Sequence, residues 1–227
     1  MDQQGYIKTR HICFNIRQIQ DIIDIADLLD VDGVILFLDF KKAFDTVEHD
    51  FMLNVLKKFG FGESFIIWIK TLYKNITSCI FNNGWRSKSI HPSRGLRQGC
   101  SLSALVYILI AEMLATIIRN SEELTGINLE IADKPASLKL TQLADDTTIF
   151  CQNKNDDKQA LKIVDIFGKH SGLKLNRLKT ECIWIGNLKN SNETIDDIKP
   201  SKQVKALDMI FGIDNEACNL RNWKKKH

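Results

Sequence analysis

Gly33-Val34-Ile35-Leu36-Phe37-Leu38-Asp39 is an unbroken apolar run that ends in a carboxylate. A short run of β-forming apolar residues is typical of a strand that is buried on both faces of a sheet. Asp39 follows at the point where this strand leaves the core, so its side chain is expected at the edge of the sheet. The run therefore predicts a central strand with a candidate site residue at its end.

Helices and strands are expected to alternate along the chain around this strand. Apolar residues recur at helical spacing over 14–29, before the strand. The other expected elements are helices over 47–59 and 63–75, a hairpin over 78–90 turning at Asn82-Asn83-Gly84, a helix over 102–119, two short strands within 139–150, a helix over 156–170 with Gly172 as its C-cap, a strand over 183–185 and a last strand near 204–211. The turn chemistry favours antiparallel pairing, so the expected fold class is α+β, with helices on one face of the sheet.

Composition places the chain among ordinary globular proteins, with 44% hydrophobic and 26% charged residues over 227 positions. The net charge is only +3, so bulk charge does not by itself mark a nucleic-acid-binding protein. The six cysteines are scattered, which excludes zinc-finger spacing and, without a signal peptide, favours an intracellular protein with reduced thiols. The most apolar stretch, 102–118, contains Glu112 and is too short for a membrane span, so it predicts a buried helix and no membrane partner.

Two adjacent carboxylates, Asp145 and Asp146, lie at the turn between the two short strands of 139–150. Carboxylates near one another repel unless a positive charge lies between them, and Mg²⁺ is a hard cation that one or two carboxylates hold together with substrate phosphates. Two such ions can activate a hydroxyl group and stabilise a leaving pyrophosphate. The alternative is that these side chains are solvated turn residues.

One segment of the chain carries basic residues without any acidic residue. Between Glu63 and Glu112 there is no acidic residue, and the cations there are Lys70, Lys74, Arg86, Lys88, Arg94 and Arg97. Aromatic residues interleave with them, namely Trp68, Tyr73, Phe81 and Trp85. Such a segment can hold a phosphate backbone and stack on bases, unless the rings pack inward and the cations form a solvated face.

A second basic cluster, Lys174, Arg177 and Lys179, precedes the strand over 183–185. A lysine beside a carboxylate site can neutralise a triphosphate or protonate a leaving pyrophosphate. The alternative for Lys179 is an ordinary surface lysine.

The order of four motifs resembles a reverse transcriptase of the non-LTR (LINE-type) retrotransposons. The motifs are Phe37-Leu38-Asp39-Phe40-Lys41-Lys42-Ala43-Phe44-Asp45, Gly95-Leu96-Arg97-Gln98-Gly99-Cys100-Ser101-Leu102-Ser103, Leu143-Ala144-Asp145-Asp146, and Gly172-Leu173-Lys174-Leu175-Asn176 with Lys179-Thr180-Glu181. The opening Gln4-Gly5-Tyr6-Ile7-Lys8-Thr9-Arg10 is similar to the segment that precedes the palm in that family.

The resemblance implies roles for single residues. Asp39, Asp145 and Asp146 match the carboxylates that hold two Mg²⁺ ions, with Mn²⁺ able to substitute. Lys179 matches a lysine that transfers a proton to pyrophosphate. The residues implied to contact the nucleotide or template are Phe44 (which excludes a ribose 2′-OH), Gln98, Arg97 and, with a looser alignment, Arg10.

The resemblance also implies the domain organisation. The fold would be a polymerase palm with a ferredoxin-like antiparallel sheet and partial fingers over residues 1–227. Fingers-like portions are expected at about 1–30 and 61–100, the palm at about 31–60 and 101–212, and the start of a missing thumb after 213. The chain departs from the family pattern at Ser101, Ala104, Leu143 and Asp208, and it reads as a piece of a larger element protein without endonuclease or thumb.

The function expected from these residues is RNA-directed DNA polymerase activity with an RNA template, a DNA primer and dNTPs as partners. The rest of a retroelement protein would be supplied elsewhere. One alternative is a catalytically inactive remnant that only binds nucleic acid. Another is a palm-fold cyclase that binds two nucleoside triphosphates without a template, although the second and fourth motifs speak against it.

Overall fold

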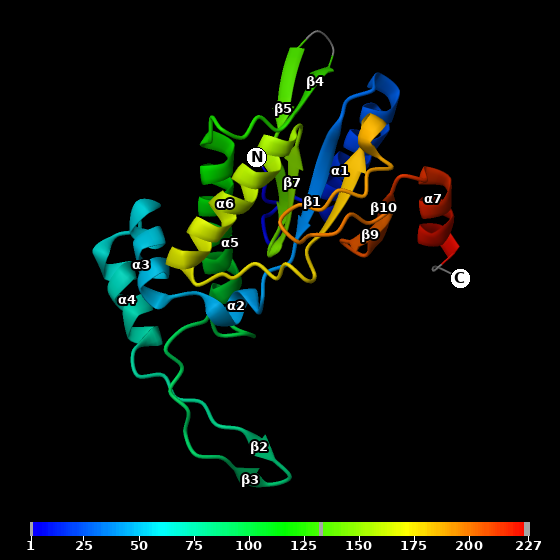
Figure 1. Cartoon of the computed structure of the whole chain (residues 1–227). Coiled ribbons are helices and arrows are strands. Elements are labelled where there is room, and N and C mark those ends of the chain that lie inside the picture. The colour runs from blue at the N-terminus through cyan, green and yellow to red at the C-terminus, as the bar shows by residue number, and fades with distance from the viewer. Residues whose placement is uncertain (1, 132–133, 225–227) are drawn as a thin grey trace.

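The computed structural model describes residues 2–131 and 134–224, and its centre is a four-stranded antiparallel sheet (Figure 1). The strands lie in the order β6 (Leu140–Leu143), β7 (Asp146–Cys151), β1 (Gly33–Leu38) and β8 (Glu181–Ile185). Helix α5 (Ser101–Asn120) comes between β1 and β6, and α6 (Lys154–Ser171) comes between β7 and β8. This βαββαβ connection confirms the predicted α+β class and the ferredoxin-like sheet.

Strand β1 occupies an inner position of the sheet. Leu36 pairs with Ile149 of β7 on one side and with Cys182 of β8 on the other. All six residues of β1 are buried, as the unbroken apolar run predicts. Both faces of the sheet therefore need a cover of apolar side chains.

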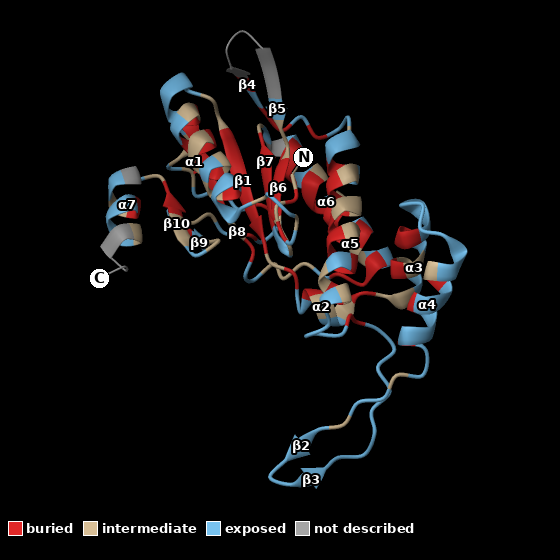
Figure 2. Ribbon diagram, turned by 180° about the vertical axis from the view of Figure 1, so that it is seen from behind, coloured by how far each residue is buried: buried red, intermediate tan, exposed pale blue. Residues whose placement is uncertain are grey.

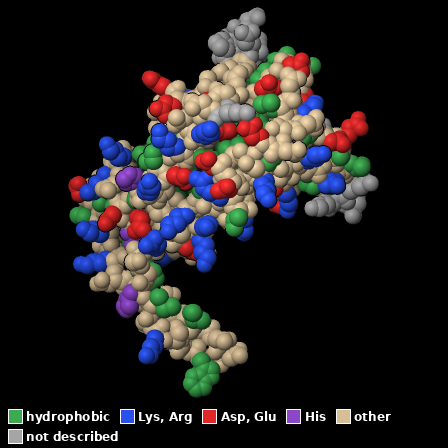
Figure 3. Space-filling model, in the orientation of Figure 1, with side chains coloured by type: hydrophobic (Ala, Val, Ile, Leu, Met, Phe, Trp, Pro, Cys, Tyr) green, Lys and Arg blue, Asp and Glu red, His purple; other side chains and the backbone are tan. Residues whose placement is uncertain are grey.

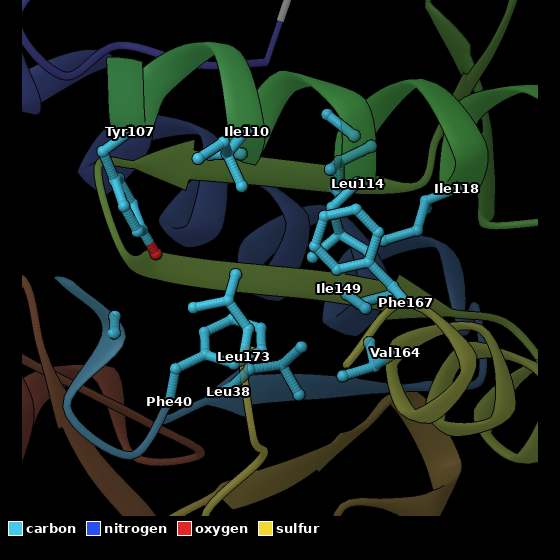
Figure 4. Packing of buried hydrophobic residues seen from close by; sticks show 14 of the residues in the cluster. Leu38, Phe40, Tyr107, Ile110, Leu114, Ile118, Ile149, Val164, Phe167 and Leu173 are labelled. Atoms are coloured by element: carbon cyan, nitrogen blue, oxygen red, sulfur yellow. The ribbon is translucent and has the colours of Figure 1, made fainter. Parts of the chain in front are cut away.

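One face is covered by α5 and α6, with α3 (His49–Lys58) and α4 (Glu63–Tyr73) packed outside them (Figure 2). Figure 4 shows Ile110 and Leu114 of α5 meeting Ile149 of the sheet and Phe167 of α6. Burial of each such side chain contributes about 1.5–3 kcal/mol to folding. By length and composition helix α5 could cross a membrane, so the expectation that this stretch is too short was wrong. The helix lies against the sheet with apolar side chains in this core, which confirms the predicted buried helix.

The opposite face of the sheet is covered by a second layer of elements that the sequence did not predict. Helix α1 (Ile12–Leu29) and the hairpin of β9 (Gln203–Ala206) and β10 (Met209–Gly212) pack there against Ile35 and Phe37. The rings of Phe37 and Phe211 are stacked with centroids 6.0 Å apart. The expectation of helices on one face thus holds for α5 and α6 but is incomplete, because an inner strand that is apolar on both sides requires a second layer.

The prediction of a single strand near 204–211 was wrong, because the structure has two strands there. Leu207 and Asp208 both have left-handed backbone conformations, with φ of 53° and 59°, and these reverse the chain between β9 and β10. Also unpredicted are α7 (Asn215–Lys224) and the hairpin of β4 (Ile127–Ile131) and β5 (Lys134–Leu138). Short elements of this kind give little periodic signal.

The remaining elements are the short helix α2 (Ala43–Thr46), the turn η1 (Gly186–Leu188) and the hairpin of β2 (Phe81–Asn82) and β3 (Trp85–Arg86). The β2–β3 hairpin turns where the sequence predicted and projects away from the body of the molecule (Figure 1).

Gly172 ends α6 with φ of 84°, and a Cβ there would collide with the carbonyl oxygen of Thr46. The predicted C-cap is therefore confirmed, and glycine is required for close packing as well as for the turn.

Candidate active site

Three carboxylates lie near one another at one end of the sheet. The β1–β7 ladder ends with Leu38 opposite Thr147, so one further step brings Asp39 opposite Asp146. Asp145 occupies the turn between β6 and β7, next to Ala144, whose φ is 55°. The antiparallel pairing thus brings together Asp39 and the Asp145-Asp146 pair, which are more than a hundred positions apart in the chain.

These carboxylates carry negative charge that the surrounding protein does not neutralise. The pKa of Asp146 is raised from 3.8 to about 6, first by partial desolvation and then by repulsion from Asp145, Asp39 and Asp208. Among the described residues, no lysine or arginine forms an ion pair with Asp39, Asp145 or Asp146. The arrangement favours a bound cation.

Asp208 is a fourth carboxylate near this site that sequence reasoning did not assign to it. It lies at the turn between β9 and β10, where it also forms an ion pair with Lys205 at 3.2 Å. Its influence on Asp146 arises because the β9–β10 hairpin packs beside the sheet. The sequence gives no sign that Asp208 lies near Asp146, because residue 208 was expected inside a strand and not at a turn.

Asp39 is held by the segment that precedes β8. The side-chain amide of Asn176 donates to Asp39 Oδ2 at 2.8 Å, and the backbone N–H of Asp39 donates to Thr180 Oγ1 at 3.3 Å. The backbone N–H of Asn176 also donates to the carbonyl oxygen of Asp39 at 2.7 Å. Asn176 is therefore a positioning residue for the Asp39 carboxylate, a role that its place in the fourth motif did not reveal.

The Asp145-Asp146 turn is held from the N-terminal segment by the buried side chain of Gln3. Its Oε1 accepts the backbone N–H groups of Ala144 at 2.9 Å and of Gly5 at 2.7 Å, and its Nε2 donates to the carbonyl oxygen of Ala144 at 3.3 Å. A Cβ at Gly5 would lie 2.6 Å from the backbone nitrogen of Ala144, so only glycine fits against the turn. The N-terminal segment is thus part of the support for the candidate site.

Replacing Gln3 with alanine is expected to lower the free energy of unfolding by about 1–3 kcal/mol, because two backbone N–H groups lose their acceptor in a buried place. The half-buried Gln18 on α1 offers a matched control. Urea titrations of Gln3→Ala and Gln18→Ala would compare them. Equal stability of the two variants would show that Gln3 does not hold the turn.

Phe44 and Gln98 line one cavity of about 470 Å³, together with Arg97 and the N-terminus of α5. Phe44 is half-buried, and its ring is stacked on that of Tyr107 with centroids 4.4 Å apart and an interplanar angle of 19°. Tyr107 is fully buried, and its pKa is raised by burial and then by Asp145 and Asp146. Tyr107 therefore both supports the Phe44 ring and lies within electrostatic range of the carboxylate pair, a link that the sequence did not show.

A second cavity, of about 630 Å³, lies between the motif 94–98 and the base of the β2–β3 hairpin. Gln98 and Arg97 line both cavities. Gln98 donates to Asp45 Oδ1 at 3.0 Å, and Arg97 donates to the carbonyl oxygen of Leu72 at 3.0 Å. Asp45 thus orients Gln98, which the resemblance implies as a nucleotide or template contact.

The structure does not place Lys179 at the carboxylates or Arg10 in either cavity. Lys179 is exposed on the turn before β8, between Asn176 and Thr180, and no contact of its side chain with the carboxylates is formed in the described chain. Arg10 donates to the carbonyl oxygen of Gln3 and lines neither cavity. Arg10 is thus linked to the Asp145 turn through Gln3, and the roles of both residues stay predictions.

The raised pKa of Asp146 predicts a pH-dependent stability. As the pH rises from about 4 to about 6, an unfolded chain loses this proton before the folded chain does, so folded-state stability falls over that window. Asp146→Asn is expected to match the wild type near pH 4 and to exceed it at pH 7 by about 1 kcal/mol or less, because solvent screens this exposed group. Urea unfolding at both pH values tests the sign. A wild type that gains stability relative to the variant as the pH rises would contradict it.

Comparisons with known proteins identify the family of this chain. The family described as reverse transcriptase (RNA-dependent DNA polymerase) matches residues 2–211. The chain is 30% identical over 189 residues to the uncharacterized 149 kDa protein of transposon TX1 from Xenopus laevis, covering 83% of this chain and 14% of that protein. It is 27% identical over 187 residues to a Pol polyprotein of retrotransposable element R2 from Popillia japonica, covering 82% of this chain and 30% of that protein.

Solved telomerase structures share the fold. The apo telomerase of Candida tropicalis matches with a TM-score of 0.62 and 15% identity, over 93% of this chain and 36% of that chain. The Candida albicans telomerase, solved with a fragment of telomeric RNA, matches with a TM-score of 0.58 and 12% identity, over 92% of this chain and 33% of that chain. These similarities support the polymerase palm and fingers fold.

The family match includes the Asp39 strand, the Gln98 loop and the Asp145-Asp146 turn, and the curated relatives come from TX1 and R2 elements. The resemblance to non-LTR retrotransposon enzymes is therefore confirmed. This chain spans about 14% of the TX1 protein and 30% of the R2 polyprotein from Popillia japonica. The chain belongs to the reverse transcriptase family.

Proposed function

We propose that this chain is an RNA-directed DNA polymerase domain that adds dNTPs to a primer 3′-OH along an RNA template. The observation that carries the proposal is that Asp39, Asp145 and Asp146 lie near one another at one end of the sheet, with no ion pair to a lysine or arginine among the described residues. The Phe44–Gln98 cavity supports it, because residues matched to nucleotide contacts line a space near the N-terminus of α5.

Reverse transcriptases as a family use divalent metal ions. The donors here fit Mg²⁺, a hard cation, since Asp39, Asp145 and Asp146 supply carboxylate oxygens without a competing lysine or arginine. Across the described residues, no three acidic, histidine or cysteine side chains converge into a preformed metal cage. That geometry suits Mg²⁺, which takes one or two carboxylates and completes its shell with water and substrate phosphates.

Two Mg²⁺ ions bound there, with Mn²⁺ able to replace them, would activate the primer hydroxyl and stabilise the leaving pyrophosphate. Asn176 keeps the Asp39 carboxylate oriented, and Gln3 keeps the Asp145-Asp146 turn in place. Phe44, backed by Tyr107, would exclude a ribose 2′-OH from the cavity. Gln98 would contact the nucleotide or template, and Lys179 would donate a proton to pyrophosphate.

The partners proposed for this chain are an RNA template, a DNA primer and dNTPs. The test is dNTP incorporation by the purified chain on a primed RNA template in Mg²⁺ at low salt, with template binding measured in parallel. Incorporation would establish the activity. Template binding without incorporation would favour the other reading, a domain that binds nucleic acid without catalysis.

A further inference from the structure

The β2–β3 hairpin is exposed and carries both aromatic and basic side chains. Every residue from 80 to 94 is exposed, and Figure 3 shows the hairpin standing clear of the body with hydrophobic side chains along it. Phe81 is 69% exposed and Trp85 is 82% exposed. Large aromatic rings are stabilised by burial, and neighbouring exposed rings on one projecting element are typical of a binding surface.

The structure separates the aromatic residues of this segment into two groups. Tyr73 is buried, with its ring 5.0 Å from that of His49, so it belongs to the core. Trp68, Phe81 and Trp85 are exposed. The alternative that the rings of the basic segment pack inward is thus right for Tyr73 only.

The register of the hairpin places an aromatic ring and a cation on the same face. Phe81 is directly opposite Arg86, and Asn82 is directly opposite Trp85. Because side chains alternate along a strand, Phe81 and Arg86 share one face and Trp85 lies on the other. Lys88 lies two positions after Arg86, beyond the end of β3, in the adjoining exposed segment.

The cations on and beside this face have no partner within the protein. Arg86 and Lys88 form no hydrogen bond or ion pair through their side chains in the described ranges. No acidic residue occurs between Glu63 and Glu112, so the hairpin itself has no carboxylate that would repel a phosphate. By contrast, Arg94 at the base of the hairpin is paired with Glu48 at 3.1 Å.

We propose that the hairpin face made of Phe81 and Arg86, with the adjoining Lys88, binds single-stranded nucleic acid. The Phe81 ring would stack on an unpaired base, and the two cations would contact the neighbouring phosphates. A duplex fits this face less well, because its bases are already stacked on one another. The hairpin base lines the 630 Å³ cavity that contains Gln98, so the bound strand can continue toward the candidate active site. The inference rests on the proposed function only for identifying that strand as the template.

The test measures binding of a fluorescein-labelled oligouridylate of about 15 nucleotides by anisotropy, without Mg²⁺ or dNTP. Phe81→Ala is expected to weaken binding by about fivefold or more, since stacking on one ring has an effect of that size. Trp85→Ala, an aromatic truncation on the opposite face, is expected to stay within about twofold of the wild type. Phe14→Ala on α1, also an exposed ring, is the control outside the hairpin.

The salt dependence tests the cations separately. Replacing Arg86 and Lys88 together by glutamine is expected to reduce the slope of log affinity against log salt by about 0.7 for each charge removed. Unchanged affinity in Phe81→Ala would overturn the proposal, as would an equal loss in Trp85→Ala. It would also be overturned if the hairpin variants bound RNA normally but lost a self-association seen for the wild type by sedimentation, since the hairpin would then be a protein interface.

The binding assay and the incorporation assay can fail independently. Hairpin-dependent RNA binding with no incorporation, in both the wild type and Asp145→Asn, would remove the polymerase proposal and leave the binding face. Incorporation that is insensitive to Phe81→Ala, together with unchanged RNA binding, would remove the binding face and leave the polymerase. Thermal unfolding of the hairpin variants should match the wild type, because these side chains lie outside both cores.

Discussion

Asp145→Asn is expected to abolish dNTP incorporation, with a loss of about a thousandfold or more, while the protein stays folded. A carboxylate that holds a catalytic metal contributes several kcal/mol to the transition state, and each 1.36 kcal/mol changes the rate tenfold. Asparagine keeps the shape of the side chain but removes its charge. Asp145 is exposed on a turn beside Asp146, so its neutralisation relieves repulsion and should not destabilise the fold. Primer extension on an RNA template and a urea titration measure the two effects.

The matched control is Asp30→Asn, at the opposite end of the same central strand. Asp30 is exposed with φ of 52°, a conformation that asparagine tolerates well. Its replacement should leave incorporation within about twofold of the wild type, since β1 separates it from Asp39 by about 20 Å. Retained incorporation in Asp145→Asn, or equal losses in both variants, would remove Asp145 from the catalytic site.

Phe44→Ala is expected to let ribonucleotides into the site. The ring forms part of the wall of the 470 Å³ cavity, and its removal leaves room for a 2′-OH. Selectivity for dNTP over rNTP, measured as the ratio of kcat/KM values, should fall roughly ten- to two-hundred-fold, the range that a steric pocket can provide. Incorporation of dNTP should persist, because Phe44 supplies no charge to the reaction.

Tyr107→Phe separates the ring from its hydroxyl group. The ring stacked under Phe44 remains, so selectivity should stay within about twofold of the wild type. Unchanged selectivity in Phe44→Ala would show that another side chain excludes the 2′-OH. A loss of selectivity in Tyr107→Phe as large as that in Phe44→Ala would assign the effect to the hydroxyl group instead of the ring stack.

Strong local patterns made much of the fold predictable. The apolar run of β1, the Asn82-Asn83-Gly84 turn and the C-cap at Gly172 each report a local requirement of the backbone. The second layer formed by α1 and the β9–β10 hairpin was not predictable in this way. An amphipathic helix such as α1 could cover either face of the sheet. Its packing against Ile35 and Phe37 decides which face it covers, and this packing is visible only in the tertiary structure.

The sequence by itself determined which carboxylates to propose for the site, because the order of the motifs pointed to Asp39, Asp145 and Asp146, and residues of this type suit a divalent metal. Tertiary structure decided what surrounds them. Four different segments bring further side chains to the site, namely those of Asn176, Gln3, Tyr107 and Asp208. The spacing of these residues along the chain does not indicate that they lie near the carboxylates. Contacts of this kind arise from strand pairing and layer packing between distant segments, whereas sequence patterns report only the conformation of neighbouring residues.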